Sequence, residues 1–463
     1  MNDLPEIFLL RMKELLSAEE YSAFCNSYLH TPVRGLRMNA LKDYCWLGGA
    51  SSIPFSYGEN VPWCKTGFVY SSEERPAKTI AYHAGLFYIQ EPSAMCPAEV
   101  LGVEPGQAVL DICAAPGGKS VQIAGHLKGE GVLVSNDASA SRSRALVKNL
   151  ERAGVTNSIV LTEQPNRLAE KFEGHFDRIL VDAPCSGEGM FRRDADAVKA
   201  YTANKPEACA AVQKEILRHA ATMLKPGGRM VYSTCTFNPE ENENVIASFL
   251  ENYTEFSLVK IEHEKLGVQP GLNGLVQTAR IWPHLAKGEG HFIALMERAK
   301  EGSSLTEERL VQPSANPSGK GNRKIIPREF SEFCDEFLNI PLCKNHLVLH
   351  GVNLYSQSVP LELKGLRVAR SGWFLGEVAK NRFVPSHALA MGLRKEQVHY
   401  TVEFSAADAE KFLRGESLAM PPSCPPLSGK PWVLVCYEGS PLGWARLVQG
   451  RLKNNLPVGW VVK

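Results

Sequence analysis

Several features that would place this 463-residue chain in a specialised class are missing from its sequence. None of its 12 cysteines belongs to a CxxC pair or a clustered Cys/His tract. That absence argues against a metal site or a disulfide framework and fits a reducing cytosol. No run of 18 apolar residues could span a membrane, and the start, MNDLPEIFLLRMKELL, is typical of an amphipathic helix rather than a signal peptide. We expect a soluble, cytoplasmic protein without a metal.

The net charge is only +1, but the two signs are distributed unevenly. From Lys320 to Lys463 there are 19 Lys/Arg against 12 Asp/Glu, a net of +7. The preceding residues carry 32 against 38, a net of −6. A basic tail on an acidic body points to a polyanionic partner. A solvated basic face without any partner would give the same balance.

Strand and helix patterns alternate from Ala108 onward, which predicts an α/β fold with a mostly parallel, doubly wound sheet. Helical patterns lie around residues 139–153, 207–224 and 239–253. The strand-like runs are AVLDIC, GVLVSND, SIVLT, DRILVDAP, GRMVYST, FSLVKI and HFIALME. The expected organisation is an N-terminal segment that begins helical (1–75), the sheet domain (76–297), a Ser/Gly/Pro-rich linker (298–326) and a C-terminal region (327–463).

A glycine-rich loop, LDICAAPGGKS at residues 110–120, joins the first strand of the sheet to a helix. Gly117 and Gly118 allow a ligand to approach the backbone, and the helix N-terminus offers unpaired N–H groups. The first glycine of a GxxxxGKS phosphate loop would fall on Cys113, and a GxGxxG sequence is also missing. Asp137 ends the next strand, the usual place for a ribose-hydroxyl acceptor. The set favours an adenosine cofactor without a pyrophosphate; a tight turn with a capping Asp is the alternative.

Two cysteines follow two of the predicted strands: Cys185 in DAPCSGEGMF and Cys235 in YSTCTFNPEEN. Because ligand chemistry gathers at the carboxyl ends of parallel strands, we expect both thiols at one edge, beside the glycine loop. Paired thiols there favour nucleophilic chemistry on a soft electrophile. Either cysteine alone would more often be a small buried hydrophobe.

Together these segments resemble the Sun/Fmu (Nol/Nop/Sun) family of S-adenosylmethionine-dependent RNA cytosine-carbon-5 methyltransferases. The resemblance covers residues 1–300 and includes RGLRMN, AGLFYIQEPSAM, DICAAPGGKS, DAPCSGEGMF, YSTCTFNPEENE and RIWPHLAKGEGHFIA. Over 330–463 it is weaker and points to the ribosomal-RNA (RsmF-like) branch. It implies a class I Rossmann-like methyltransferase domain, an N-terminal RNA-binding segment and a C-terminal RNA-binding region ending in an α+β PUA-like domain.

The activity implied by the resemblance is methylation of an RNA cytosine by S-adenosyl-L-methionine, with 16S ribosomal RNA the expected substrate and a monomer the expected form. Carbon 5 becomes nucleophilic when a thiolate adds to carbon 6, and protonation of ring nitrogen 3 assists that addition. The resemblance assigns attack to Cys235, product release to Cys185, contact with the base to Asp182, and ordering of the site to Lys119. DNA enzymes attack with the Pro-Cys thiol, here Cys185, which is the alternative assignment.

Further site residues follow from the same resemblance. After the third strand the family places Asn or Asp against adenine, whereas this chain reads VLTEQPNRL, so Glu163 or Thr162 must serve there. The other implied cofactor residues are Cys113, Ala114, Ala115, Pro116, Gly117, Gly118, Lys119, Asp137, Arg142 and Asp182.

RNA contacts are expected on both ends of the chain. The N-terminal candidates form a basic strip, Arg34, Arg37, Asn39 and Lys42, for which a solvated edge is the alternative. The C-terminal candidates are Arg367 and Arg370, with Lys380 and Arg382 beside them. Trp373 and Phe374 could stack on bases, but individually they fit a hydrophobic core better. Alternative functions are a transfer RNA cytosine methyltransferase, a methyltransferase for proteins or small molecules, and a non-catalytic ribosome assembly factor.

Overall fold

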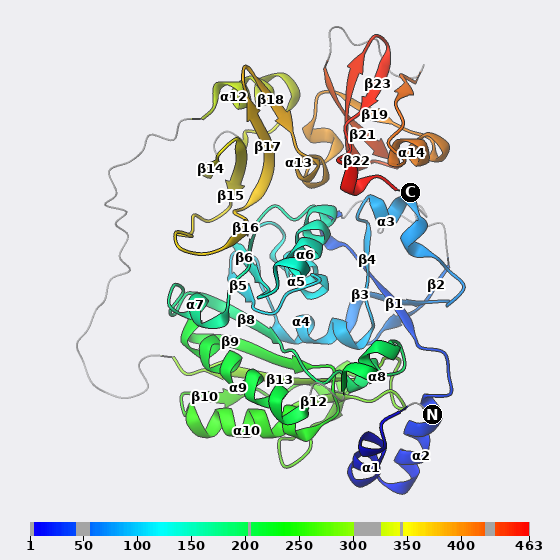
Figure 1. Ribbon diagram of the computed structural model, residues 1–463, viewed down its shortest axis with the longest axis vertical. Helices are drawn as coiled ribbons and strands as arrows, with labels where there is room; N and C mark the ends of the chain where they lie inside the picture. Colours follow the sequence, from blue (N-terminus) through cyan, green and yellow to red (C-terminus); the bar gives the residue numbers. More distant parts are fainter. Residues whose placement is uncertain are drawn as a thin grey trace, which may run out of the picture.

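The computed structural model describes residues 4–42, 56–201, 205–300, 326–342, 346–421 and 431–462. At its centre is a ten-stranded sheet in the order β11-β12-β13-β9-β8-β5-β6-β7-β16, with β10 paired to β13 (Figure 1). The strands from β9 to β7 are parallel to one another, and both flanks are antiparallel. The predicted α/β class and parallel, doubly wound core are therefore confirmed, within a sheet that is mixed as a whole. The parallel strands are β5 (Ala108–Asp111), β6 (Val132–Asn136), β7 (Ser158–Leu161), β8 (Phe176–Asp182) and β9 (Leu224–Thr234).

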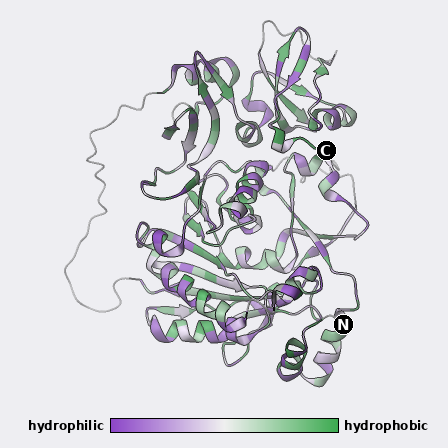
Figure 2. Cartoon of the chain, viewed as in Figure 1, coloured by the Kyte–Doolittle hydropathy of each residue, from purple (hydrophilic) through white to green (hydrophobic). Residues whose placement is uncertain are grey.

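Both faces of this sheet are buried because its strands carry apolar residues at successive positions. Along β5, Val109 packs into one hydrophobic core and Leu110 into the other, as the alternation of side chains along a strand requires. Figure 2 shows the surrounding helices with both hydrophilic and hydrophobic stretches. One face is covered by α4 (Cys96–Leu101), α5 (Gly118–Leu127) and α6 (Ala140–Ala153), and the other by α7 (Pro165–Ala169), α9 (Pro206–Met223) and α10 (Glu243–Asn252).

The antiparallel flank beside β9 comes from the last part of the sheet domain. It consists of β13 (His291–Arg298), β12 (Ala279–Ile281), β11 (Gln269–Pro270) and β10 (Phe256–Leu258). The buried ion pair between Arg280 of β12 and Glu243 of α10, 2.6 Å long, fixes this flank to the helical layer. No helix among the described residues is long and apolar enough to cross a membrane.

The N-terminal segment forms a helical hairpin followed by a small sheet. As predicted, the chain begins with a helix, α1 (Glu6–Leu15), and α2 (Ala18–Ser27) follows it after a capping box at Ser17. Phe8 and Phe24 pack against residues beyond β8 and β9, so the hairpin lies against the loops that carry the two cysteines. The sheet has the order β2-β3-β1-β4, with β1 (Arg34–Met38), β2 (Tyr57–Val61), β3 (Cys64–Tyr70) and β4 (Phe87–Ile89). Because β4 lies beyond residue 75, this sheet extends past the expected boundary.

The C-terminal region contains two further sheets, which lie above the central sheet in Figure 1. The helix α13 (His387–Gly392) contacts both sheets and also α6. The first sheet contains β14 (His346–His350), β15 (Asn353–Gln357), β17 (Trp373–Ala379) and β18 (Arg382–Pro385), beside α12 (Arg328–Phe337). The second contains β19 (Thr401–Glu403), β20 (Leu418–Ala419), β21 (Trp432–Tyr437), β22 (Ser440–Val448) and β23 (Arg451–Asn454), with α14 (Ala406–Leu413). The linker expected over 298–326 falls almost entirely outside the described residues.

One strand of the C-terminal region belongs to the central sheet. β16 (Val368–Arg370) pairs antiparallel with β7, and the Thr162 N–H donates to the Arg367 carbonyl at 2.8 Å. The residues before it, Leu361, Leu363 and Leu366, pack against the hydrophobic core beneath α9 and α10. The C-terminal region is thus joined to the sheet domain by a shared strand and a shared core.

Candidate active site

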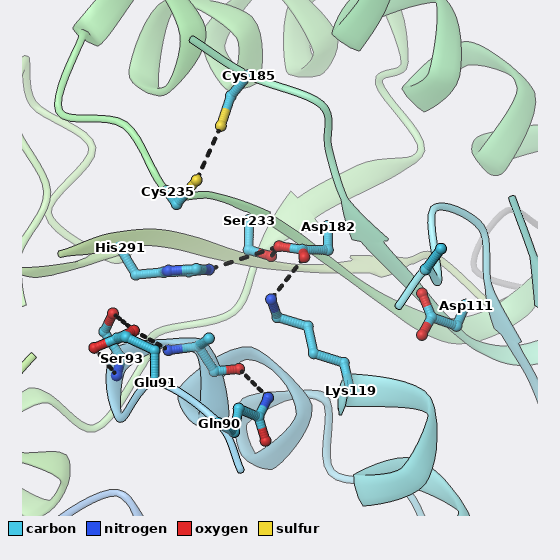
Figure 3. Close-up of polar contacts among 12 residues, drawn as sticks. Gln90, Glu91, Ser93, Asp111, Lys119, Asp182, Cys185, Ser233, Cys235 and His291 are labelled. Atoms are coloured by element: carbon cyan, nitrogen blue, oxygen red, sulfur yellow. Dashed lines mark hydrogen bonds and ion pairs between the residues drawn. The ribbon is translucent and has the colours of Figure 1, made fainter. Parts of the chain in front are cut away.

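The carboxyl ends of β8 and β9 bring the two predicted cysteines together. β8 ends at Asp182 and β9 at Thr234, and the loops that follow carry Cys185 and Cys235. Their Sγ atoms lie 3.4 Å apart, at hydrogen-bond distance for two thiols (Figure 3). The expectation that both thiols meet at one sheet edge is therefore confirmed by the structure.

Hydrogen-bond donors surround the Asp182 carboxylate (Figure 3). Lys119 Nζ donates to Oδ2 at 2.6 Å, and Ser233 Oγ donates to Oδ1 at 2.9 Å. The His291 Nε2 atom lies 3.6 Å from Oδ1. Burial raises the pKa of Asp182, but Lys119 and His291 outweigh that effect and hold the pKa well below its usual range. Asp182 is consequently a carboxylate and not a carboxylic acid.

The contact between the two thiols affects the protonation of Cys185. The hydrogen bond to Cys235, together with burial, raises the pKa of the Cys185 thiol well above its ordinary value. Cys185 therefore keeps its proton in this arrangement, and either sulfur can be the donor of the contact.

A buried carboxylate ties the two cysteine loops together. Glu241 accepts hydrogen bonds from the backbone N–H and the hydroxyl of Ser186, next to Cys185. The same hydroxyl bonds to Thr236, next to Cys235, at 2.9 Å. Gln213 of α9 donates both to Glu241, at 3.1 Å, and to the Pro184 carbonyl, at 2.9 Å. The loop after β8, the loop after β9 and the helix α9 are thereby joined by hydrogen bonds, which fix the distance between the two thiols.

A cavity of about 810 Å³ opens at this sheet edge. Both thiols line it, together with Asp182, Asp137, Arg142 and Cys113 of the glycine loop. A smaller cavity of about 220 Å³ shares Cys113, Ala115 and Asp182 with the first. The thiols, Asp137, Asp182 and the loop residues Cys113 and Ala115 face the larger cavity, whose volume is sufficient for a nucleoside-sized ligand.

The residues of this region fit S-adenosylmethionine. Asp137 follows β6, and its carboxylate accepts from the N–H groups of Ala115 and Ser139, at 3.3 and 2.9 Å. Arg142 binds the Ala115 carbonyl at 2.7 Å and so holds the same loop. The buried Oδ1 of Asp111 has no partner in the structure, which leaves an acceptor free beneath the loop. Carboxylates at the ends of successive strands suit ribose hydroxyls and a cationic amino group.

Comparison with known proteins decides the family. The family model described as 16S rRNA methyltransferase RsmB/F matches residues 98–297, and the model for the N-terminal domain of 16S rRNA methyltransferase RsmF matches 4–92. The models for its first C-terminal domain and its PUA domain match 332–393 and 399–462. A ribosomal RNA small subunit methyltransferase F of Vibrio campbellii is 33% identical, over 98% of this chain and 97% of the relative. The chain belongs to the RsmB/F family.

The RsmB/F assignment agrees with further relatives. Ribosomal RNA small subunit methyltransferase F of Erwinia tasmaniensis is 31% identical over 98% of this chain and 96% of its own length. A methyltransferase homologue from Pyrococcus horikoshii has 30% identity and a TM-score of 0.53, over 64% of this chain and 99% of its own. NSun6 from the same organism, solved with SFG, has a TM-score of 0.54 over the same shares, and its 21% identity supports the fold alone. This RsmB/F member is an S-adenosylmethionine-dependent rRNA methyltransferase.

The two residues expected to contact adenine, Glu163 and Thr162, lie outside the lining of the larger cavity. Glu163 does not line the cavity, because its carboxylate accepts the Arg367 backbone N–H at 2.7 Å and pairs with the Arg367 guanidinium at 3.3 Å. Thr162 is buried and its hydroxyl bonds to Ser143. The next residues along the chain, Gln164, Pro165 and Asn166, line the cavity instead.

The expected N-terminal basic strip is also corrected. Arg37 is 3% exposed and donates to Gln90 at 3.1 Å and to the Gly118 carbonyl at 2.8 Å, so it supports the cofactor loop from behind. Asn39 is buried and donates to the Gly85 and Ala153 carbonyls. Lys42 donates to the Met391 carbonyl of α13, and burial lowers its pKa to about 8. Arg34 and Lys42 are half-exposed, and of these two the Lys42 ammonium is already bonded within the protein.

In the C-terminal region, two arginines expected to contact phosphates, Arg367 and Arg370, pair with acidic side chains of the protein itself. Arg370 pairs with Glu151 of α6 at 2.9 Å and lies over the Phe374 ring. Arg367 pairs with Glu163, although its side chain is 64% exposed. Trp373 belongs to the hydrophobic core, as the interpretation of individual aromatics favoured, and its indole N–H donates to Ala388. Arg370 and Arg367 thus attach the C-terminal region to the sheet domain.

Sequence reasoning gave no role to several residues of the site. His291, inside the quoted segment RIWPHLAKGEGHFIA, faces Asp182, and Ser233 of YSTC donates to it. Glu241 of NPEEN joins the cysteine loops. Each lies within a recognised segment, so position in a motif was the available signal. The contact of His291 depends on the pairing of β13 with β9, and that of Ser233 on the register between β8 and β9, neither of which local patterns specify.

Proposed function

We propose that this chain methylates carbon 5 of a cytosine in 16S ribosomal RNA, with Cys235 as the attacking nucleophile and Cys185 as the group that enables product release. The observation that carries the proposal is the pair of thiols 3.4 Å apart, on a cavity that also holds Asp182 and the cofactor loop. The substrate follows from relatives named ribosomal RNA small subunit methyltransferase F. We further propose that the enzyme acts in the cytoplasm, as a monomer and without a metal.

The arrangement of the thiols explains the order of the steps. Cys235, whose Sγ lies 3.4 Å from that of Cys185, adds as a thiolate to carbon 6 of the cytosine after losing its proton to water, and makes carbon 5 nucleophilic. Bound S-adenosylmethionine supplies an electrophilic methyl group for that carbon. Once the Cys235 sulfur is bonded to carbon, the contact that raises the Cys185 pKa is weakened. Cys185 can then lose its proton to water, and its thiolate takes the proton from carbon 5 as Cys235 leaves as a thiolate.

The remaining residues orient the reactants. Asp182, held ionised by Lys119, is suited to accept from the exocyclic amine of cytosine. Asp137 is placed to accept from ribose hydroxyls of the cofactor, and the loop from Cys113 to Lys119 supplies backbone groups around it. The target base must leave its stack to reach a site at the base of a cavity.

Substitution of each thiol separates the two proposed roles. Cys235→Ala should abolish methylation and form no covalent protein–RNA species, because the ring is never activated. Cys185→Ala should attack and methylate but stall before elimination, and so accumulate an adduct that survives denaturing electrophoresis and carries the transferred methyl group. Small-subunit RNA, transfer RNA and assembled small subunits, each with radiolabelled cofactor, would serve as substrates.

The control is Cys436→Ala, a buried cysteine of β21 in the C-terminal region, which should behave like the unmodified protein. An adduct in Cys235→Ala and none in Cys185→Ala would reverse the assignment. Methylation of transfer RNA alone would overturn the ribosomal substrate.

A further inference from the structure

His291 occupies an unusual position for a histidine without an assigned role. It begins β13, is 4% exposed, and its ring points at Asp182 (Figure 3). Nε2 lies 3.6 Å from Asp182 Oδ1, and it forms no hydrogen bond with any described residue. His291 is therefore held next to the Asp182 carboxylate, and its Nε2 atom is not occupied by a hydrogen bond to another part of the protein.

The partners of the ring determine its protons. Nδ1 lies 3.2 Å from the Gly290 carbonyl, which can only accept, so Nδ1 carries a proton. A bare Nε2 lone pair would then face the Asp182 carboxylate, and the two would repel each other. A proton on Nε2 turns that repulsion into attraction between an imidazolium and a carboxylate. An Nε2–H of this ring would therefore point at the Asp182 carboxylate.

The other charged groups near the ring are already paired. Glu91, in the loop after β4, accepts from Ser93 and from the Glu289 backbone N–H. Glu289 pairs with Arg192 at 2.7 Å. On the far side of Asp182, the ammonium of Lys119 binds Oδ2.

Two further groups lie on the elements beside β13. Arg280 of the neighbouring β12 is paired with Glu243. The thiols follow β8 and β9, beyond Asp182. The proton on His291 Nε2 therefore has Asp182 as its nearest acceptor.

The proposed cytosine chemistry requires a proton that Asp182 alone does not provide. Thiolate addition at carbon 6 places negative charge on ring nitrogen 3, which must be protonated for carbon 5 to become an enamine. Asp182 lines the cavity but is ionised, because Lys119 and Ser233 donate to it and His291 lies 3.6 Å away. An ammonium holds its proton more tightly than an imidazolium does. Of the two basic neighbours, His291 is therefore the better proton donor.

We propose that His291 is a positioning residue that stores this proton and passes it through Asp182 to ring nitrogen 3 of the target cytosine. This inference rests on the proposed attack by Cys235. When the Sγ–carbon 6 bond forms, the Nε2 proton moves to Asp182, and the carboxylic acid so formed passes that same proton to nitrogen 3, which leaves Asp182 again a carboxylate and His291 neutral. After methyl transfer the nitrogen 3 proton returns along the same path, and the imidazolium is restored before Cys235 leaves.

The test measures attack separately from elimination. Small-subunit RNA transcribed with 5-fluorocytidine has no hydrogen at carbon 5 to remove, so it traps the covalent adduct after methyl transfer. The full-length protein is mixed with this RNA and cofactor, and the rate of adduct formation is followed from pH 5.5 to 9. The variants are His291→Gln and His291→Asn, and the control is His263→Gln, a histidine of α11 (His263–Leu266) whose ring contacts the Thr278 carbonyl and not Asp182.

We expect His291→Gln to slow adduct formation by roughly 10²- to 10³-fold, as for loss of a proton donor, with unchanged RNA affinity. The unmodified protein should lose rate at alkaline pH as the imidazolium loses its proton, and the variant should lack that alkaline limb. A slower variant that keeps the limb would show a purely structural role and overturn the proposal, as would a variant of normal rate. His291→Asn, with a shorter side chain, provides the same readouts if the glutamine variant fails to fold. If the unmodified protein forms no adduct, the proposed cytosine chemistry fails instead.

Discussion

At the scale of single residues, three acids at the ends of neighbouring strands show how environment decides role. Asp137 and Asp182 line the main cavity, and donors surround both carboxylates. Asp111 is 1% exposed and has one bonded oxygen, which accepts from Ser120 at 2.7 Å. Burial therefore raises the pKa of Asp111 to about 7, against the opposing effect of that hydroxyl, while Asp182 nearby raises it further. An aspartate is thus kept ionised at the end of β8, whereas the aspartate at the end of the neighbouring β5 holds its proton up to about pH 7.

The pKa of Asp111 predicts a pH dependence of stability. In the unfolded chain an aspartate loses its proton near pH 4, whereas the folded protein retains it up to about pH 7. Between these values the folded state binds the additional proton, so the free energy of unfolding should fall as pH rises. Asp111→Asn cannot ionise and should flatten this decline in urea titrations without cofactor at pH 5 and pH 7.5.

Asp196→Asn provides the control, since Asp196 lies on the surface of α8 (Ala195–Tyr201) and pairs with Lys199 of the same helix. Its curve should match that of the unmodified protein. If Asp111→Asn shows the same loss of stability between the two pH values as the unmodified protein, Asp111 is ionised throughout and the prediction is wrong.

At the scale of elements, the site depends on loops held by polar contacts rather than by packing. The loops after β8 and β9 are bridged through Ser186, Thr236 and Glu241. Because Glu241 is buried, its carboxylate has no water to replace these partners. The distance between the thiols therefore depends on one acid that need not touch the substrate.

Replacing that acid should loosen the cysteine pair. In Glu241→Gln the new amide N–H₂ is itself a donor, so it would face the donor groups of Ser186 or Gln213 without forming a hydrogen bond. The free energy of unfolding should fall by roughly 1.5–3 kcal/mol, the range for hydrogen bonds to a charged group. Adduct formation should slow as the thiols separate. Glu240→Gln, at the exposed neighbouring position, is the matched control and should change neither quantity. Equal urea midpoints for the two variants would contradict this account.

The same scale shows what could be predicted from sequence. The apolar runs ending at Asp111, Asp182 and Thr234 became strands of a parallel core, because a strand buried on both faces needs a nearly continuous apolar sequence. β16 was not predicted, since its three residues, Val368–Arg370, carry no pattern and form a strand only by pairing with β7. The burial of Arg37 and Asn39 could not be predicted for a related reason. Their side chains bond to backbone groups far along the chain, so their burial follows from tertiary contacts.

At the scale of the whole molecule, the change from an acidic to a basic sequence near Lys320 coincides approximately with the boundary between the sheet domain and the C-terminal region. The boundary is not exact, because β16 of the basic part pairs with the central sheet. The basic residues after Lys320 that the structure describes lie mostly in the two C-terminal sheets and in the helices and loops around them, while β16 and the leucines before it complete the central domain. Deletion of the whole region would therefore expose the edge of β7 and part of the core, and would disturb more than RNA binding. Reversal of exposed charges is a sharper way to ask what the basic region does.

Lys380 and Arg382 suit this purpose, because both are exposed on the hairpin between β17 and β18. If the hairpin binds phosphates, Lys380→Glu combined with Arg382→Glu should weaken RNA binding almost equally for all sequences. The slope of log affinity against log salt should become shallower by roughly one for each phosphate that the variant no longer neutralises, because fewer counterions are released. Cofactor affinity should stay unchanged, since the hairpin lies in a different sheet from the loop at Gly117. The matched control is Lys260→Glu with Lys265→Glu, two exposed lysines of the acidic body. Filter binding over a range of salt would decide: if both pairs change the slope equally, the hairpin has no particular role, and if neither does, RNA reaches the site by another surface.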